Sequence, residues 1–220
     1  MPSTAKTSFI ENKKDVERLW AIHQEVAGKG AGRKHDVEVL NRTAIVLITA
    51  CWESYVEDVA KESLDFLLAN TPNSQCIPSK VRAFIAQPYL KQEDPRKLWE
   101  LTDSGWKTII LAKKSEIIEN WLGSFNTPKP AQVNQLFDEL LGIRKISEKW
   151  RWKNMPKAKA SEKLEQYVTI RGNIAHRIRH DEQVYKNWST DYLNHIEGLV
   201  DATESAISDH LQGITTKAPW

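Results

Sequence analysis

Hydrophobic residues recur at helical spacing along almost the whole chain. The longest run of this kind spans residues 36–69, contains neither Gly nor Pro, and is apolar on nearly all sides around residues 44–52. A helix at the surface of a globular protein carries a single apolar stripe. The run therefore predicts a long helix that is buried either at the centre of the fold or at a subunit contact.

Boundary residues divide the rest of the chain into shorter predicted helices. Pro88 ends one, Asp94 caps the next at a following proline, and Gly142 ends another. Ser189 is placed to cap the last helix, which runs to about residue 211. We expect the other helices to cover residues 9–27, 79–87, 106–122, 133–141 and 157–178.

No two segments alternate apolar and polar residues with a hairpin turn between them. The sequence therefore predicts an all-α fold, a single helical bundle over residues 1–220 with extra short helices between two long early helices and two late ones. We expect flexible ends at about residues 1–7 and 213–220, with Trp220 hanging free.

Composition narrows the class of protein. The chain has 220 residues, of which 40% are hydrophobic and 27% charged, so it can bury a core and is not a disordered chain. No stretch reaches the ~18 uninterrupted apolar residues of a membrane span, and charges interrupt every apolar run near the N-terminus. Two cysteines form no disulfide framework, so we expect a cytoplasmic protein with no membrane partner.

Charge is distributed unevenly, although the net charge is only +2. Residues 144–179 hold eleven Lys or Arg and three Glu, which gives this segment +8 and leaves −6 for the remainder. Such asymmetry indicates a polyanionic partner such as RNA for one face, or else a solvated helix surface rich in lysine.

Cations alternate with indole rings at the start of this basic segment. This pattern suits base stacking and phosphate contact on a single strand, and it predicts an RNA-binding set. The alternative is that one tryptophan belongs to the core and the other caps the bundle. The residues are Lys149, Trp150, Arg151, Trp152 and Lys153.

An Arg followed five residues later by a His is the strongest candidate for chemistry. Between Arg171 and His176 lie Gly, Asn, Ile and Ala, which leave a small and approachable surface. On an ideal helix Arg171 and His176 lie ~140° apart, whereas Asn173 shares a face with His176. Two copies facing each other across a two-fold axis would bring both Arg and both His into one cleft.

RNA carries its own nucleophile, the 2′-hydroxyl beside each phosphate. His176 suits the proton transfers of RNA cleavage, and the Arg171 guanidinium suits the charged phosphate oxygens. Asn173 would position His176 or the ribose. The alternative is an Arg and a His that pair with neighbouring carboxylates. The positive field would be extended along the phosphate backbone by Arg177, Arg179 and His180.

A metal centre is an alternative interpretation of His176 and of the next histidine, His180. His176 and His180 are four residues apart, which is a spacing of metal ligands on a helix, but no third ligand follows at a convincing spacing. We therefore expect neither a metal nor a cofactor. Cys51 lies in apolar surroundings and reads as a core residue.

The segment RGNIAH, near the end of an all-α chain, resembles the R-x(4–6)-H signature of the HEPN superfamily. The segment CWESYVED, residues 51–58, is similar to the aromatic-Glu-x-aromatic pattern of the RiboL-PSP-like HEPN branch. The resemblance extends from about residue 36 to residue 211 and matches Arg171 and His176 to the signature. One position departs from the family, which often has Asn directly after the Arg, where this chain has Gly172.

The resemblance implies a dimeric helical bundle whose motif helices meet at the dimer interface. It also implies a metal-independent endoribonuclease with Arg171 and His176 as catalytic residues. Such enzymes serve in toxin–antitoxin and antiviral defence systems, so an antitoxin or another regulatory protein is an expected partner. Glu53 matches the acidic residue on the early helix and would approach the cleft, or else pairs with a nearby cation.

Two further functions stay open on the sequence alone. Some members of the family have lost catalysis, so the chain is alternatively an inactive bundle that binds RNA or a protein partner. The third alternative is a purely structural helical dimer without affinity for RNA.

Overall fold

A computed structural model describes residues 1–27, 37–91, 93–177 and 186–220. Throughout this described part the chain is helical, and the one β feature is an isolated bridge between Trp152 and Met155. The all-α prediction is confirmed. The α-helices are α1 (Thr4–Ala27), α2 (Glu38–Asn70), α3 (Ser79–Leu90), α4 (Gly105–Ala112), α5 (Lys114–Leu122), α6 (Pro130–Leu141), α7 (Lys157–Arg177) and α8 (Lys186–Thr215). Short 3₁₀ turns are η1 (Ser74–Cys76), η2 (Pro95–Leu101) and η3 (Ile146–Lys149).

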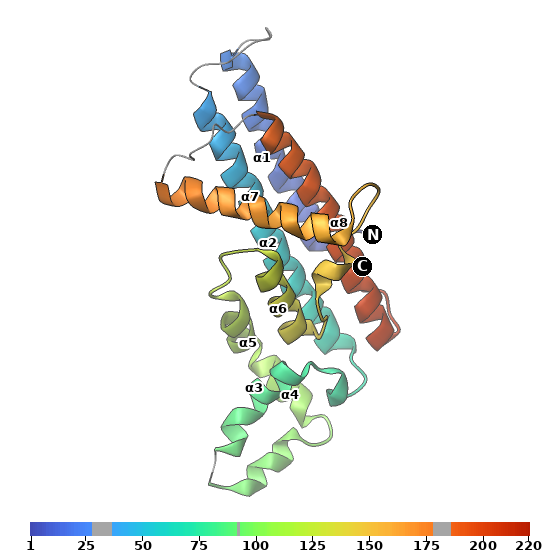
Figure 1. Ribbon diagram of the computed structural model, residues 1–220. Helices are drawn as coiled ribbons and strands as arrows, with labels where there is room; N and C mark the ends of the chain where they lie inside the picture. Colours follow the sequence, from blue (N-terminus) through green and yellow to red (C-terminus); the bar gives the residue numbers. More distant parts are fainter. Residues whose placement is uncertain (28–36, 92, 178–185) are drawn as a thin grey trace.

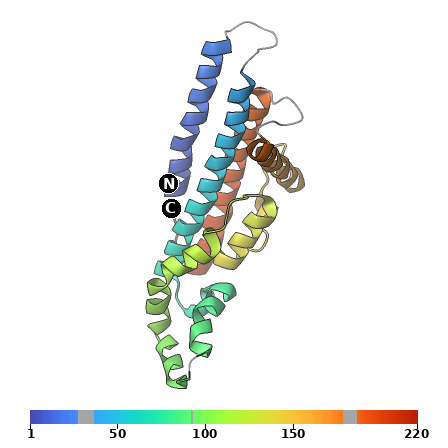
Figure 2. The same ribbon diagram turned by 90° about the vertical axis from the view of Figure 1, so that its left-hand side faces the viewer.

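Three long helices, α1, α2 and α8, lie side by side and form the body of the molecule (Figure 1). Helix α7 crosses this body at a steep angle, and Figure 2 shows it nearly end-on against the three long helices. Helices α3, α4 and α5 form an arm at the end of the body where α2 ends (Figure 1). None of the helices in the described residues is both long and apolar enough to cross a membrane.

Helix α2 is the central element, as its apolar pattern predicts. Its neighbours α1, α6, α7 and α8 cover it on several sides. Trp52 is fully buried, stacks on Tyr55, and meets the edge of Trp150 with ring centroids 6.0 Å apart. The buried polar ends of these rings are satisfied, because the Trp52 indole donates to the Pro128 carbonyl and the Tyr55 hydroxyl to the Val200 carbonyl. These contacts fix α2 against the elements that follow it.

Some predicted helix ends are confirmed and others are wrong. Helix α6 ends at Gly142, whose φ of 76° is the left-handed conformation that glycine adopts freely. Pro88 does not end α3, because a proline in the last turn removes only one hydrogen bond and the helix continues to Leu90. Ser189 is not an N-cap. It is buried inside α8, where its hydroxyl accepts a hydrogen bond from the Trp20 indole.

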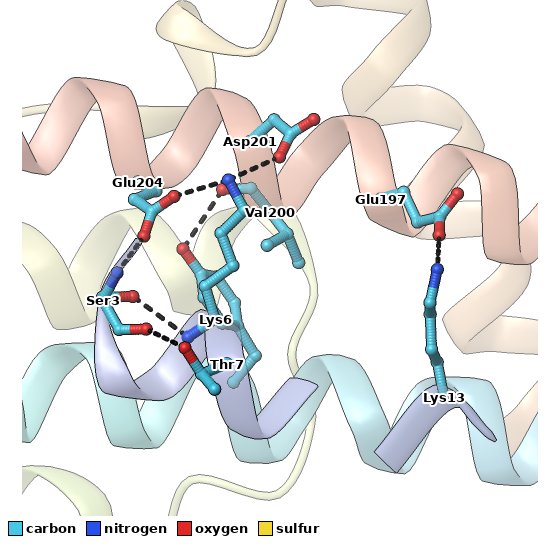
Figure 3. A network of polar contacts seen from close by, with 9 residues as sticks. Ser3, Lys6, Thr7, Lys13, Glu197, Val200, Asp201 and Glu204 are labelled. Atoms are coloured by element: carbon cyan, nitrogen blue, oxygen red, sulfur yellow. Dashed lines mark hydrogen bonds and ion pairs between the residues drawn. The ribbon is translucent and has the colours of Figure 1, made fainter. Parts of the chain in front are cut away.

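Both ends of the described chain contact the body of the fold, and Trp220 does not hang free as the sequence predicts. Helix α1 begins at Thr4, and the Ser3 amide donates to the buried carboxylate of Glu204 at 2.7 Å. Lys6 forms ion pairs with Glu204 and with Asp201, at 2.7 and 3.0 Å (Figure 3). At the other end α8 continues to Thr215, and Trp220 packs against the core as a partly buried ring. The N-terminal turn is therefore anchored to α8.

A buried histidine lies where α7 and α8 meet. The His195 ring is 5.4 Å from the Trp152 ring, and Tyr167 stacks on Tyr192 beside it. Nε2 of His195 donates to the Ala160 carbonyl at 3.0 Å, and its Nδ1 is buried without a partner. Burial lowers the pKa of His195 to about 4, with the positive charge of Lys163 adding to the shift and the hydrogen bond to Ala160 opposing it.

We expect His195 to make the fold sensitive to acid. The unfolded chain takes up a proton at this imidazole near pH 6.5, while the folded protein does so only near pH 4, so stability is lost as pH falls through this window. Relative to His195→Gln, the wild-type free energy of unfolding should fall by up to about 3 kcal/mol more between pH 7 and pH 4. Urea unfolding at a series of pH values measures the difference. Parallel pH profiles for the two proteins would contradict this prediction.

Candidate functional site

Arg171 lies on α7 where that helix crosses α2, and its guanidinium faces Glu53 of α2. The closest approach is 3.7 Å, from a terminal guanidinium nitrogen to Oε2 of the carboxylate, with side-chain exposures of 29% and 19%. That distance is an ion pair without a hydrogen bond. Two residues that are 118 positions apart in the sequence are therefore brought together, and Glu53 has the nearby cation that the alternative interpretation expects.

The Glu53 carboxylate sits in an unfavourable place for a charge. Its Oε2 atom is buried and has no hydrogen-bond partner. Burial raises the pKa of Glu53, the Arg171 guanidinium opposes that rise, and the nearby Glu57 adds to it. Arg171 is thus the main source of stabilisation for the ionised form of Glu53.

His176 and Asn173 lie on the outer face of α7. Both side chains are exposed, and neither has an ion pair or a hydrogen bond with any other described residue. A Cβ added at Gly172 would meet nothing within 4 Å, so the helix surface next to Arg171 is open. Ile174 is buried and anchors the same turn to the core. The last turns of α7 therefore present a histidine and an amide to solvent, beside an arginine held from within.

Arg171 and His176 are not on one face of the helix. A separation of five residues rotates the second side chain by ~140° and carries it ~7.5 Å along the axis. Arg171 accordingly faces α2, and His176 faces away from the core. Three other predicted site positions lie outside the described residues, namely the side chain of Arg177 and the residues Arg179 and His180.

The basic segment around the two tryptophans divides into a buried and an exposed part. Trp150 is fully buried, and its indole donates to the Thr203 hydroxyl at 2.9 Å, so it is the core member of the pair and offers no ring face to a base. Trp152 is half-buried and lies against Gly198, where a Cβ would come within 2.7 Å of the indole ring. The three cations of the segment are exposed, namely Lys149, Arg151 and Lys153.

A groove of about 770 Å³ lies between this basic segment and α8. Lys149, Arg151 and Trp152 line one side, and α8 supplies the other. The α8 side is absent from the predicted site, although its polar and small residues recur every four positions and so share one helical face. The residues of that face are Gly198, Asp201, Ala202, Ser205, Ala206, Asp209 and His210.

The described part of the chain holds neither a cluster of metal ligands nor an activated cysteine. In residues 1–27, 37–91, 93–177 and 186–220, no group of three or more His, Cys, Asp or Glu side chains is arranged to hold a metal ion. Cys51 is buried, as predicted, and burial with the charge of Asp15 raises the pKa of its thiol to about 11, so the nucleophilic thiolate is disfavoured.

Comparison with known proteins adds one match to these placements. Residues 8–209 match the family model described as RiboL-PSP-HEPN. The matched span includes α2 with Glu53 and α7 with Arg171 and His176. No curated protein and no solved structure matched the chain.

We expect the free energy of unfolding to register the contact between Arg171 and Glu53. Arg171→Ala removes the cation opposite a half-buried carboxylate and should destabilise the fold at pH 7 by about 1–2 kcal/mol. The double variant Arg171→Ala with Glu53→Gln should recover most of that loss, because the amide carries no charge. Urea unfolding of the four proteins in the cycle measures the coupling, and strictly additive effects would contradict it.

Proposed function

The chain belongs to the RiboL-PSP-HEPN family, and from this premise we propose that it is a metal-independent endoribonuclease that cuts RNA with Arg171 and His176. The observation that carries the proposal is the arrangement on α7, where an exposed His176 follows an Arg171 that is fixed against Glu53 of α2. A cation in a defined place and a free imidazole are the two groups that metal-free cleavage of RNA requires.

The reaction uses the 2′-hydroxyl of RNA as the nucleophile. Its oxygen attacks the adjacent phosphorus, and the bond from phosphorus to the 5′-oxygen of the next nucleotide breaks. One proton leaves the 2′-hydroxyl and one reaches the 5′-oxygen, so the products are a 2′,3′-cyclic phosphate and a 5′-hydroxyl. His176 takes part in these proton transfers as the base or the acid. Arg171 donates to the phosphate oxygens, whose negative charge grows in the transition state.

Glu53 acts through Arg171 in this scheme. Its buried oxygen is 3.7 Å from the guanidinium, so the carboxylate restricts where Arg171 can point. Asn173 lies three residues before His176 on the same face of α7, which suits it to position His176 or the ribose. Neither group needs to exchange a proton with the RNA.

The proposed active form is a homodimer joined through the motif helices. One chain offers one His176, whereas the reaction moves two protons at opposite sides of the phosphorus. Because the outer face of α7 is exposed, a second copy can lie against it and bring a second Arg171 and His176 to the same phosphate. The two imidazoles then serve as base and acid.

The rest of the strand is proposed to bind the basic segment. Lys149, Arg151 and Lys153 are exposed cations beside the half-buried ring of Trp152, and they suit phosphate contact and stacking. Arg177, Arg179 and His180 follow the motif directly in the sequence and would add positive charge at the cleft.

We propose a toxin or antiviral-defence effector as the biological role, with an antitoxin or other regulatory protein as partner. A second candidate is a bundle of the same fold that binds RNA or a protein without cleavage. Gly172 favours it, because the chain places the Asn one position later than the family pattern does and leaves open space next to Arg171.

Cleavage of single-stranded RNA in EDTA tests the proposed reaction. We expect His176→Ala to lower the rate at least about 100-fold, since general acid–base catalysis contributes about 10²–10⁴. Arg171→Lys should also lose rate, because an ammonium cannot donate two parallel hydrogen bonds. The matched control is Arg18→Ala, since Arg18 is an exposed arginine that also precedes a histidine, His23, by five residues. Mass spectrometry should find cyclic phosphate ends, and equal rates for wild type and His176→Ala would remove His176 from the mechanism.

Binding of RNA to the basic segment is tested separately with a 2′-O-methyl oligonucleotide, which lacks the nucleophile and is not cut. Arg151→Ala and Lys153→Ala should each weaken binding and lower the slope of log affinity against log salt by about 0.7. Lys80→Ala, an exposed cation on α3, is the control. Fluorescence anisotropy at several salt concentrations gives the slopes. If both variants show the same salt dependence of RNA affinity as the wild type, the RNA strand does not bind to the basic segment.

A further inference from the structure

The groove between the basic segment and α8 holds charges that the fold leaves unused. Lys149 and Arg151 on one wall have no ion pair within the described residues, and neither does Asp209 on the other wall. Ion pairs are common elsewhere on this surface, for example Lys13 with Glu197 and Lys129 with Glu165. Two cations and a carboxylate thus remain available around one concave surface.

The Trp152 ring and the α8 wall of the groove are held in place by contacts within the fold. Trp152 packs against α8 at Gly198, where an added Cβ would come within 2.7 Å of the indole, and its ring centroid lies 5.4 Å from that of His195. Asp201 forms an ion pair with Lys6, as Figure 3 shows. Nε2 of His210 donates a hydrogen bond to the Leu141 carbonyl at 2.9 Å. Groups that are already held in place lose little entropy when a ligand binds.

The chemical groups that line the groove match one kind of ligand. The apolar part of the lining consists of the Trp152 indole on one side and the methyl groups of Ala202 and Ala206 on the α8 side, which suits a flat ring. The cations lie at one wall and suit a phosphate, while Ser205 and Asp209 at the other wall suit hydroxyl and amino groups. The volume of about 770 Å³ is within the usual range of small-ligand sites.

We propose that this groove binds one nucleotide unit, with its base on the indole of Trp152, its phosphate at Lys149 and Arg151, and its sugar or base edge at Ser205 and Asp209. The unit is either a free nucleotide or one residue of an RNA strand, which present the same groups to the walls. The proposed ligand makes hydrogen bonds to both walls of the groove. This distinguishes its binding from a simple electrostatic attraction of anions to exposed lysines.

The inference rests on the proposed binding of RNA by the basic segment, from which it takes Lys149, Arg151 and Trp152, and it does not depend on the proposed cleavage. The groove begins at the turn before α7, whereas His176 lies at the other end of that helix. From Lys157 to His176 the helix rises ~28 Å. The groove therefore contacts a different part of a strand, and its occupancy is measurable in a protein that has lost His176.

Isothermal titration calorimetry tests the proposal with full-length His176→Ala protein, so that no probe is cut. The probes are AMP, UMP, inorganic phosphate, and a 2′-O-methyl hexanucleotide with and without a 5′-phosphate. Ser205→Trp fills the groove from an exposed position of α8, and Ser115→Trp makes the same change at an exposed position of α5 away from it. Lys149→Ala removes one proposed phosphate contact. Circular dichroism confirms that each variant keeps its helices.

We expect a nucleotide or the hexanucleotide to bind, Ser205→Trp to weaken that binding at least tenfold, and Lys149→Ala to weaken it about fivefold. Ser115→Trp should bind as the parent does. If AMP or UMP binds more tightly than the hexanucleotide, the ligand of the groove is a free nucleotide. If the hexanucleotide binds only when it carries a 5′-phosphate, the ligand is the end of an RNA strand. The proposal is overturned if inorganic phosphate binds as tightly as AMP and UMP, if no nucleotide probe binds, or if Ser205→Trp binds as the parent does. Loss of cleavage by His176→Ala is recorded in a separate assay, so the two proposals fail independently.

Discussion

One half-buried ion pair determines which way Arg171 faces where α7 crosses α2. Glu53 carries a carboxylate oxygen that has neither solvent nor a hydrogen bond, and the guanidinium of Arg171 is the cation that faces it. Removing either charge alone leaves the other in a poor environment, so the pair specifies how the two helices meet more than it stabilises them. That specification fixes Arg171 in space. His176, five residues later, is then left outside the core, and no other described residue forms an ion pair or hydrogen bond with it.

Much of this arrangement could be predicted from the sequence, for reasons that are local. The uninterrupted apolar run predicts the central position of α2, because a helix that is apolar all round has to be covered. Gly142 predicts the end of α6, because its left-handed conformation is costly for other residues. The family resemblance suggests that Glu53 approaches the cleft, and neither the resemblance nor the pattern of residues says which cation it faces. No local rule connects two residues on different helices, since their contact arises only when the helices pack.

The misassigned residues show where local reasoning stops. Ser189 has the chemistry of an N-cap, but its hydroxyl serves Trp20 on another helix instead. Trp150 and Trp152 are indistinguishable by composition and spacing, yet one is sealed in the core by Trp52 and Thr203 while the other lies on α8. Which ring is buried depends on the path of the chain between α6 and α7. The groove on α8 has the same origin, because its two walls come from segments about fifty residues apart.

The exposure of His176 also constrains the proposed chemistry. Proton transfers at the two sides of a phosphorus need two groups, and the described surface of one α7 helix offers one imidazole beside Asn173. A monomer would have to use water for the second transfer, and so would cleave more slowly than an assembly in which two imidazoles face one phosphate. The inner side of α7 is covered by α2, α6, α8 and η3, so a second copy that contacts α7 would do so on the outer side, where His176 and Asn173 lie. The proposed dimer and the proposed active site thus share one surface.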